Sequence, residues 1–243
     1  NIDIEFLGMN PDQLKDYAEA IKKPHGIILI SGPTGSGKTT TLYATLKILN
    51  KEYSNILTIE DPIEYTLEGI NQVQLKESIG LTFASALRTF LRQDPDVIML
   101  GEIRDGETAQ MAVRAALTGH LVLSTIHTNS AWGTISRLMD MGVPPFLVAS
   151  TLNLSVAQRL VRVLCPKCKE QQAFKPELFP RNFKTPQNVS FHYVPKGCSD
   201  CFYTAYKGRK AVYEIIPNDH NLPEQIKNQN IDETKIRKIL NYK

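Results

Sequence analysis

The sequence predicts an α/β fold with a mostly parallel sheet, joined to a small cysteine-containing module. Between residues 25 and 162, short and almost continuously apolar runs alternate with amphipathic segments, which is the pattern of a parallel sheet covered by helices on both faces. Beyond about residue 163 this pattern stops, and a polar, proline-rich stretch separates two pairs of cysteines. We therefore predict four parts: a lead-in helix and linker (1–24), the α/β core (25–162), the cysteine module (163–214) and a C-terminal segment of short helices (215–243).

The elements are predicted in chain order from their hydrophobic periodicity. An amphipathic helix precedes Pro24. Four apolar runs predict core strands, at 27–30, 56–59, 97–100 and 120–126. Core helices are predicted at 40–46, 82–93, 107–118 and 130–142, and from residue 145 onward. Past the cysteines, we expect a strand at 210–216 and a final helix at 232–242.

A glycine-rich octet, G-P-T-G-S-G-K-T, lies between the first core strand and the helix that follows it. It matches the phosphate-binding pattern G-x-x-x-x-G-K-[ST], and a strand–loop–helix context supports such a match. Loop N–H groups and the helix N-terminus favour phosphate, while Lys38 is expected to reach the β- and γ-phosphates and Thr39 to hold Mg²⁺. The residues assigned to the nucleotide are Gly32, Pro33, Thr34, Gly35, Ser36, Gly37, Lys38, Thr39 and Thr40. The chain is therefore predicted to bind a nucleoside triphosphate.

Acidic residues follow two of the predicted strands. The strand at 97–100 leads to Glu102, the layout of a Walker B element, so Glu102 is predicted either to hold Mg²⁺ through water or to polarise the attacking water. Glu60, Asp61 and Glu64 follow the preceding strand and emerge at the same sheet edge, where ligands bind. These three acids are predicted to bind Mg²⁺ or to position water, and the alternative is that they belong to a solvated loop.

Basic residues near these strands are candidate phosphate contacts. His127 ends the last predicted core strand, and we expect it to donate to the γ-phosphate and to sense its loss. Arg88, Arg92 and Arg104 flank the Walker B strand. They are predicted to neutralise phosphate charge, including that on a neighbouring subunit, with solvated side chains as the alternative.

The four cysteines, Cys165, Cys168, Cys198 and Cys201, form two C-x-x-C pairs. Each pair can chelate one ion and four thiolates complete a tetrahedron, so we predict a zinc site. Four identical ligands leave no open coordination position, which makes the predicted zinc structural. The alternative is a thioredoxin-like redox role for the first pair.

Composition narrows the class of protein. The chain has 243 residues, 28 Lys+Arg against 25 Asp+Glu and a net charge of +3, which is too mild to indicate a nucleic-acid or membrane partner. No apolar stretch is long enough to span a bilayer, and the N-terminus lacks signal-peptide character. We therefore expect a cytoplasmic protein. Because the first residue is Asn and not Met, we also expect a longer parent protein.

Taken together, these segments closely resemble one family, the hexameric ATPases of secretion and pilus assembly. The resemblance covers about residues 5–216 and is carried by the P-loop region (26–43), an Asp box (57–64), a Gly-Glu Walker B (80–105) and a His box (118–130). The cysteines favour the type II secretion and pilus-extension members over the retraction and type IV secretion traffic ATPases, which lack them. One departure is Ala205, which stands where the family usually has glycine.

The resemblance implies a RecA-like core that works as a cytoplasmic homo-hexamer on an inner-membrane platform, reaching the membrane only through partners. ATP hydrolysis would then push a pilin-like filament outward. The catalytic residues implied are Lys38, Glu60, Glu102, His127, Arg88, Arg92, Arg104 and Arg209. The cofactors implied are ATP, Mg²⁺ and Zn²⁺.

We predict a motor ATPase for type II secretion, with pilus extension as the alternative within the family. A more distant alternative is a RecA-like motor on nucleic acid, which would need a basic stripe or stacking aromatic residues that the sequence does not display. A third is a binding module that keeps ATP as a regulatory ligand without hydrolysing it.

Overall fold

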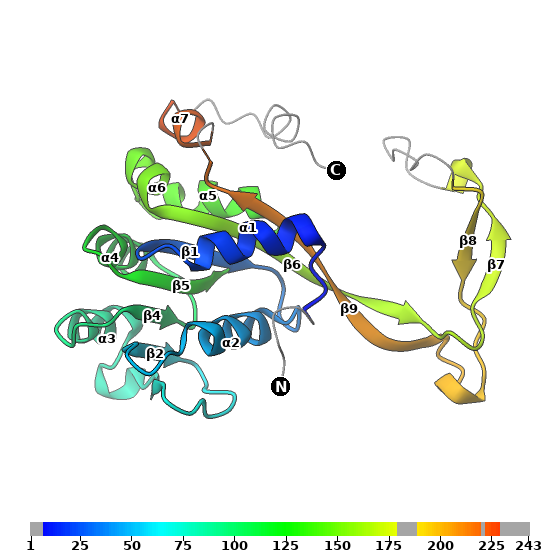
Figure 1. Ribbon diagram of the computed structural model, residues 1–243, viewed down its shortest axis with the longest axis horizontal. Coiled ribbons are helices and arrows are strands. Elements are labelled where there is room, and N and C mark those ends of the chain that lie inside the picture. The colour runs from blue at the N-terminus through cyan, green and yellow to red at the C-terminus, as the bar shows by residue number, and fades with distance from the viewer. Residues whose placement is uncertain (1–6, 179–188, 220–221, 229–243) are drawn as a thin grey trace. The chain divides into compact units, whose positions relative to one another are not determined.

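The computed structural model describes residues 7–178, 189–219 and 222–228 (Figure 1). The chain divides into two compact units, residues 1–159 with 211–243, and residues 160–210. Within the described ranges, no helix has the length and apolar character needed to cross a membrane.

The first unit is built on a seven-stranded sheet with the strand order β3-β2-β4-β5-β1-β6-β9. The strands are β1 (Gly26–Ser31), β2 (Ile56–Glu60), β3 (Asn71–Gln74), β4 (Val97–Leu100), β5 (Leu121–Ile126), β6 (Leu152–Leu164) and β9 (Tyr206–Pro217). The pairs β1–β5, β1–β6, β2–β3, β2–β4 and β4–β5 are all parallel. The predicted α/β class with a mostly parallel sheet is confirmed.

The helices alternate with the strands as predicted. They are α1 (Pro11–Ile21), α2 (Lys38–Leu49), α3 (Phe83–Phe90), α4 (Gly106–Leu117), α5 (Ala131–Asp140), α6 (Pro145–Thr151) and α7 (Leu222–Lys227). Helix α3 is shorter than the predicted 82–93, because Thr82 is its N-cap and the N–H groups of Arg92 and Gln93 form i→i−3 hydrogen bonds in place of the α-helical pattern. The predicted helix at 232–242 lies outside the described residues.

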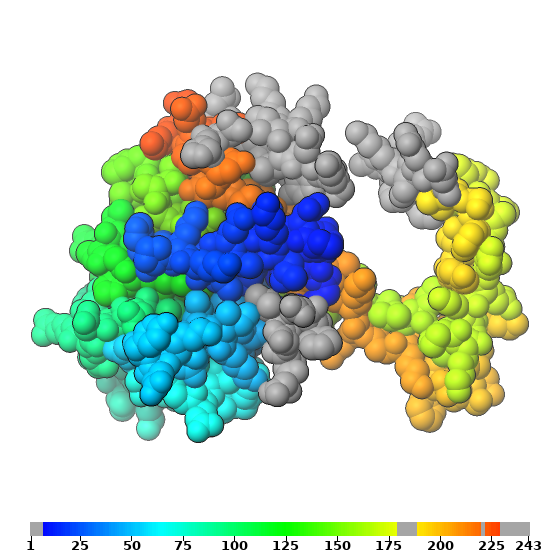
Figure 2. Space-filling model, in the orientation of Figure 1, coloured from blue at the N-terminus to red at the C-terminus, as the bar shows by residue number. Residues whose placement is uncertain are grey.

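The core has two layers, one on each face of the sheet. Helices α3, α4, α5 and α6 pack on the face that includes Ile27 and Leu29, whereas α1 and α2 pack on the face that includes Ile28 and Ile30. Figure 2 shows α1, in blue, on the outer surface of the first unit. Successive residues of β1 therefore enter opposite layers, which explains why its sequence is apolar at every position.

The sequence analysis did not predict the long strand β6, nor the short strand β3 and the two short strands within residues 160–210. Asn153, Ser155 and Gln158 are polar, but each is buried and hydrogen-bonded: Asn153 to the His25 carbonyl, Ser155 to the Ala131 carbonyl and Gln158 to the P-loop. These partners come from elements far away in the sequence. Periodicity alone therefore gives β6 the appearance of a half-exposed segment although both of its faces are covered near the core.

The second unit, residues 160–210, contains a two-stranded antiparallel sheet of β7 (Glu170–Ala173) and β8 (Phe191–Val194). The two cysteine pairs lie at turns outside these strands. Cys165 and Cys201 are buried, and together with Cys168 and Cys198 they form a small cluster of their own.

Candidate active site and metal centre

The P-loop and its neighbours lie at one edge of the sheet because the strands end in register. Ser31 of β1 lies opposite Ile126 of β5 and Ala157 of β6. The P-loop and His127 therefore leave the sheet at the level of Gln158 in β6. This carboxyl edge of a parallel sheet is where ligands bind in open α/β folds.

The P-loop glycines are required by its backbone geometry. Gly32 has φ 147° and Gly37 has φ 88°, and side chains are disfavoured in this region of φ. A Cβ at Gly32 would also lie 2.4 Å from the carbonyl oxygen of Gln158. Helix α2 begins directly after Gly37, so its first N–H groups face the loop, as phosphate binding requires.

Lys38 lies along the loop. Its Nζ donates to the carbonyl oxygens of Gly32, at 2.9 Å, and Pro33, at 3.1 Å. Burial lowers the pKa of Lys38; Glu102 opposes this shift, and Arg159 adds to it. A charged ammonium held only by neutral carbonyls is suited to accept an anion.

Gln158 fastens the loop to the sheet. Its Nε2 donates to the Ser36 carbonyl at 2.8 Å, and its Oε1 accepts from the Thr41 hydroxyl, also at 2.8 Å. The Ser36 hydroxyl beside it is buried and has no hydrogen-bond partner within the described structure. The sequence pattern did not identify Gln158, because this residue lies more than a hundred positions after the loop.

Glu102 is the centre of an ion-pair cluster. One of its oxygens pairs with Arg104, and the other lies 3.1 Å from Nε2 of His127. Arg104 also lies 3.5 Å from the Asp61 carboxylate. Three residues predicted separately, Glu102, Arg104 and His127, are thus brought together.

The charge state of Glu102 follows from this cluster. Burial alone would raise its pKa, but the hydrogen bond and charge of Arg104, with smaller contributions from His127, outweigh burial and lower the pKa below its ordinary value. Glu102 is therefore ionised at neutral pH, as a metal-directing or water-polarising carboxylate must be.

Glu60 is buried and fully engaged with protein donors. Its Oε1 accepts from Thr58, at 2.7 Å, and from Gln72, at 3.0 Å, while its Oε2 accepts a hydrogen bond from Tyr43. In this conformation Glu60 organises the interior next to the site. Asp61 and Glu64 behind it are exposed, as in the solvated-loop alternative.

The remaining predicted arginines are not gathered with Glu102. Arg88 pairs with Glu107 at the surface. Arg92 lies in the turn after α3 and is exposed, and Arg209 is an exposed residue of the second unit. All three face solvent.

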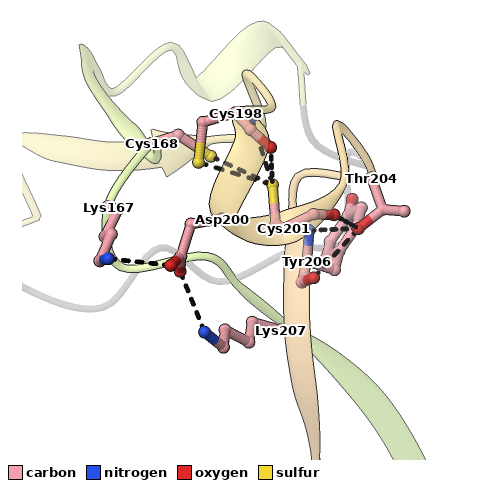
Figure 3. A network of polar contacts seen from close by, with 8 residues as sticks. All are labelled: Lys167, Cys168, Cys198, Asp200, Cys201, Thr204, Tyr206 and Lys207. Carbon is pink, nitrogen blue, oxygen red and sulfur yellow. Dashed lines mark hydrogen bonds and ion pairs between the residues drawn. The ribbon is translucent and has the colours of Figure 1, made fainter.

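The four cysteine sulfur atoms form a compact group in which all lie within 4.8 Å of one another. Sγ of Cys201 lies 3.8 Å from Sγ of Cys168 and 3.8 Å from Sγ of Cys198 (Figure 3). Zn–S bonds of about 2.3 Å in a tetrahedron place sulfur atoms about 3.8 Å apart. The residues present therefore fit a zinc ion.

Backbone donors favour a thiolate at Cys201, whereas burial and the neighbouring cysteines raise the pKa of Cys168 to about 12. Burial opposes ionisation of Cys201, but the N–H groups of Cys198 and Ala205 and the neighbouring thiols of Cys168 and Cys198 outweigh it and lower the pKa of Cys201 to about 7. The Cys198 N–H lies 3.2 Å from Sγ of Cys201. Such N–H···S contacts favour a bound metal over a protonated thiol.

A glycine-lined loop at the carboxyl edge of a parallel sheet, beside an ionised acid at a nearby strand tip, defines the class of P-loop nucleotide-binding proteins. Within that class, the chain belongs to the type II/IV secretion system protein family, whose model matches residues 1–241. It carries the ATPase fold of this family. The family expected from the motifs is thus confirmed.

Relatives of known name agree with this placement. The chain is 53% identical to type II secretion system protein E of Klebsiella pneumoniae over 221 residues, which cover 89% of this chain and 43% of that protein. It is 52% identical to the type IV pilus assembly ATPase PilB of Myxococcus xanthus over 230 residues, covering 93% and 41%. The chain therefore spans less than half the length of these relatives.

Solved structures show the same fold. The pilus retraction motor PilT with bound ADP matches with a TM-score of 0.72 at 30% identity, covering 98% of this chain and 59% of that one. The ATPase DotB of Legionella pneumophila matches with a TM-score of 0.68 at 24% identity, covering 97% and 57%; this second likeness concerns the fold alone.

Proposed function

We propose that this chain is the motor ATPase region of a type II secretion system and that it hydrolyses Mg-ATP at the P-loop edge. One observation carries the proposal: Lys38 of the P-loop interacts electrostatically with the ionised Glu102. Arg104 and His127 hold the Glu102 carboxylate in place. This arrangement meets the needs of phosphoryl transfer, since positive charge faces the phosphates and a carboxylate directs metal or water.

The roles of the residues follow from their positions. With nucleotide bound, Lys38 would exchange its two carbonyl contacts for the β- and γ-phosphates, and Thr39 would supply its hydroxyl as a ligand of Mg²⁺. Bound Mg²⁺ supplies neutralisation of phosphate charge. Glu102 orients the attacking water or the metal-bound water, and His127, which is tied to Glu102, contacts the terminal phosphate. Glu60 acts by supporting this edge from the interior.

The working form proposed is a cytoplasmic homo-hexamer on an inner-membrane platform. Exposed Arg88, Arg92 and Arg209 are available to reach a nucleotide bound by a neighbouring subunit. Arginine suits this role because its planar, permanently charged group binds phosphate through two parallel hydrogen bonds.

The test is phosphate release by the hexameric protein with Mg-ATP. Lys38→Ala and Glu102→Ala are each expected to lower turnover by at least about 100-fold. Glu19→Ala, on α1, is the matched control and should keep wild-type turnover. Unchanged turnover in both site variants would exclude hydrolysis at this edge, and tight ATP retention without turnover in the wild type would favour the regulatory-ligand alternative.

Pilus extension is the second candidate, since identity to the named pilus assembly ATPase is nearly the same as identity to the secretion protein. The two functions differ in cargo and partners and not in the chemistry of the site. Genes for a pseudopilus and a secretion channel beside the coding gene would support secretion, whereas genes for a major pilin would support pilus extension.

We further propose that the four cysteines hold one structural zinc ion per chain. Bound Zn²⁺ supplies local folding free energy, and Cys165, Cys168, Cys198 and Cys201 supply the ligands. Elemental analysis of freshly purified, reduced protein should find one zinc per chain. Protein with four reactive thiols and no metal would contradict the proposal and would favour the redox alternative.

A further inference from the structure

Two cations lie at the phosphate-binding edge without a carboxylate partner among the described residues: Lys38 and Arg159. Lys38 contacts the two P-loop carbonyls described above. The Arg159 guanidinium donates to the carbonyl oxygen of Asn129, at 3.0 Å, and to that of Gln158, at 3.5 Å. Neither takes part in an ion pair within the described ranges.

The strand register explains why these cations meet. Ser31, the last residue of β1, lies opposite Ala157 in β6, so Arg159 lies two positions beyond the level at which the P-loop begins. Its contact with Asn129 ties it to the segment after β5, two residues past His127. Because β1 lies between β5 and β6 in the sheet, the P-loop is flanked by Arg159 on one side and by His127 and Glu102 on the other, and the contact with Asn129 is made across the end of β1.

The electrostatics of this position favour an anion. Arg159 is only half-exposed, and its neutral carbonyl partners leave part of its five-donor guanidinium available. Lys38 and Arg159 repel each other at this edge, although less strongly than Glu102 attracts Lys38. Partly desolvated like charges are unfavourable unless a counter-charge is bound, and a polyphosphate supplies that charge to both at once.

We propose that Arg159 is a further nucleotide-binding residue that contacts the terminal phosphate of the triphosphate from the same chain. This inference rests on the proposed function and deepens it, because it assigns to the site a cation that no sequence motif marks. The guanidinium can bind a terminal phosphate through two parallel hydrogen bonds. Its hydrogen bond to Asn129 connects it to the segment that follows His127, the residue proposed to contact the terminal phosphate, and this favours the terminal phosphate over those bound by the loop.

The test compares binding of a slowly hydrolysed ATP analogue with binding of ADP, both with Mg²⁺. Arg159→Gln is expected to weaken binding of the ATP analogue roughly 10- to 100-fold, the effect of losing a charge-assisted hydrogen bond. Binding of ADP should change less than about threefold, because ADP lacks the terminal phosphate. Arg159→Lys keeps the positive charge but loses the paired guanidinium donors. Its affinity for the ATP analogue should lie between those of the wild type and Arg159→Gln.

Arg162→Gln is the matched control. Arg162 lies on the same strand, is exposed, and stacks on Tyr206 with 3.9 Å from its guanidinium carbon to the ring centroid, so this variant should bind both nucleotides as the wild type does. Wild-type affinities in Arg159→Gln, or equal losses for ATP analogue and ADP, would overturn the inference. Should Arg159→Gln fail to fold, the ratio of the affinities of Arg159→Lys for the ATP analogue and for ADP, compared with the wild-type ratio, decides instead. Failure of the proposed function itself gives a different result, namely a wild type that binds neither nucleotide.

Discussion

Individual residues of this chain keep unusual conformations or charge states because of their neighbours. Ala205 has φ 66°, a left-handed conformation that costs a residue with a Cβ about 1–2 kcal/mol. It persists because the Ala205 carbonyl accepts from the Cys165 N–H at 2.9 Å and joins the two cysteine pairs. Glu102 likewise remains ionised although partly buried, because Arg104 and His127 surround it.

The conformation of Ala205 leads to the first prediction. Ala205→Gly should raise the free energy of unfolding of the second unit by about 0.5–1 kcal/mol, because relief of the backbone strain exceeds the extra entropy of the unfolded chain. Ala173→Gly, at an extended position in β7, should lower it by a similar amount. Thermal unfolding of the zinc-loaded protein measures both changes, and the same sign in both variants would contradict the argument.

The second prediction concerns acid. Because the folded-state pKa of Glu102 lies below the ordinary value of 4.5, this carboxylate stabilises the fold above that pH, and the contribution is lost as the pH falls through the lowered pKa. The difference in unfolding free energy between wild type and Glu102→Gln should therefore be largest near neutral pH and shrink below pH 4.5. Chemical unfolding at a series of pH values measures it, and a difference independent of pH would exclude this role.

At the scale of elements, the sequence predicted those helices and strands whose periodicity and end signals lie within their own residues. The strands at 56–59 and 97–100 and the helix at 107–118 were placed within a residue or two, because each carries its own periodicity and end signals. Strands β6 and β3 were not predicted: β3 is polar, β6 interleaves polar with apolar residues, and both are stabilised by pairing with partners distant in the sequence. Gln158 and Arg159 were not predicted as site residues for the same reason, since their contacts are with residues distant in the sequence.

Contacts between elements give the third prediction. The Tyr43 hydroxyl on α2 donates to the buried carboxylate of Glu60 at the end of β2. Tyr43→Phe should therefore lower the free energy of unfolding by about 1.5–3 kcal/mol, the range for a hydrogen bond to a charged group.

Urea unfolding measures this loss. Tyr53→Phe is the matched control, since Tyr53 is 88% exposed, and its unfolding free energy should stay within about 0.5 kcal/mol of wild type. A Tyr43→Phe variant as stable as this control would show that the hydrogen bond from Tyr43 to Glu60 does not contribute to the free energy of unfolding.

At the scale of the whole molecule, the chain combines two units with different sources of stability. The first, residues 1–159 with 211–243, buries two apolar layers around the sheet. In the second, residues 160–210, the described buried cluster consists of cysteines. If the proposed zinc ion is bound, it supplies folding free energy to this unit that its small core lacks.

This contrast yields the fourth prediction. Removal of zinc by a chelator under reducing conditions, or Cys198→Ser, should abolish hydrogen-exchange protection in residues 160–210 while the core strands β1, β4 and β5 stay protected. Mass-resolved hydrogen exchange on the full chain measures both regions in one experiment. Unchanged protection of residues 160–210 after metal removal would mean that the cysteines alone hold that unit.

The sequence by itself determined the class of fold, the P-loop pattern and the two C-x-x-C pairs, because each depends on residues close together in the chain or on a repeating local pattern. The tertiary structure alone decided which polar side chains meet at the strand tips. It gathered Glu102, Arg104 and His127 into one cluster, enclosed Glu60 among protein donors, brought Gln158 to a loop more than a hundred residues earlier, and brought Arg159 to the segment after β5. Such contacts depend on strand order and register, which no local pattern encodes.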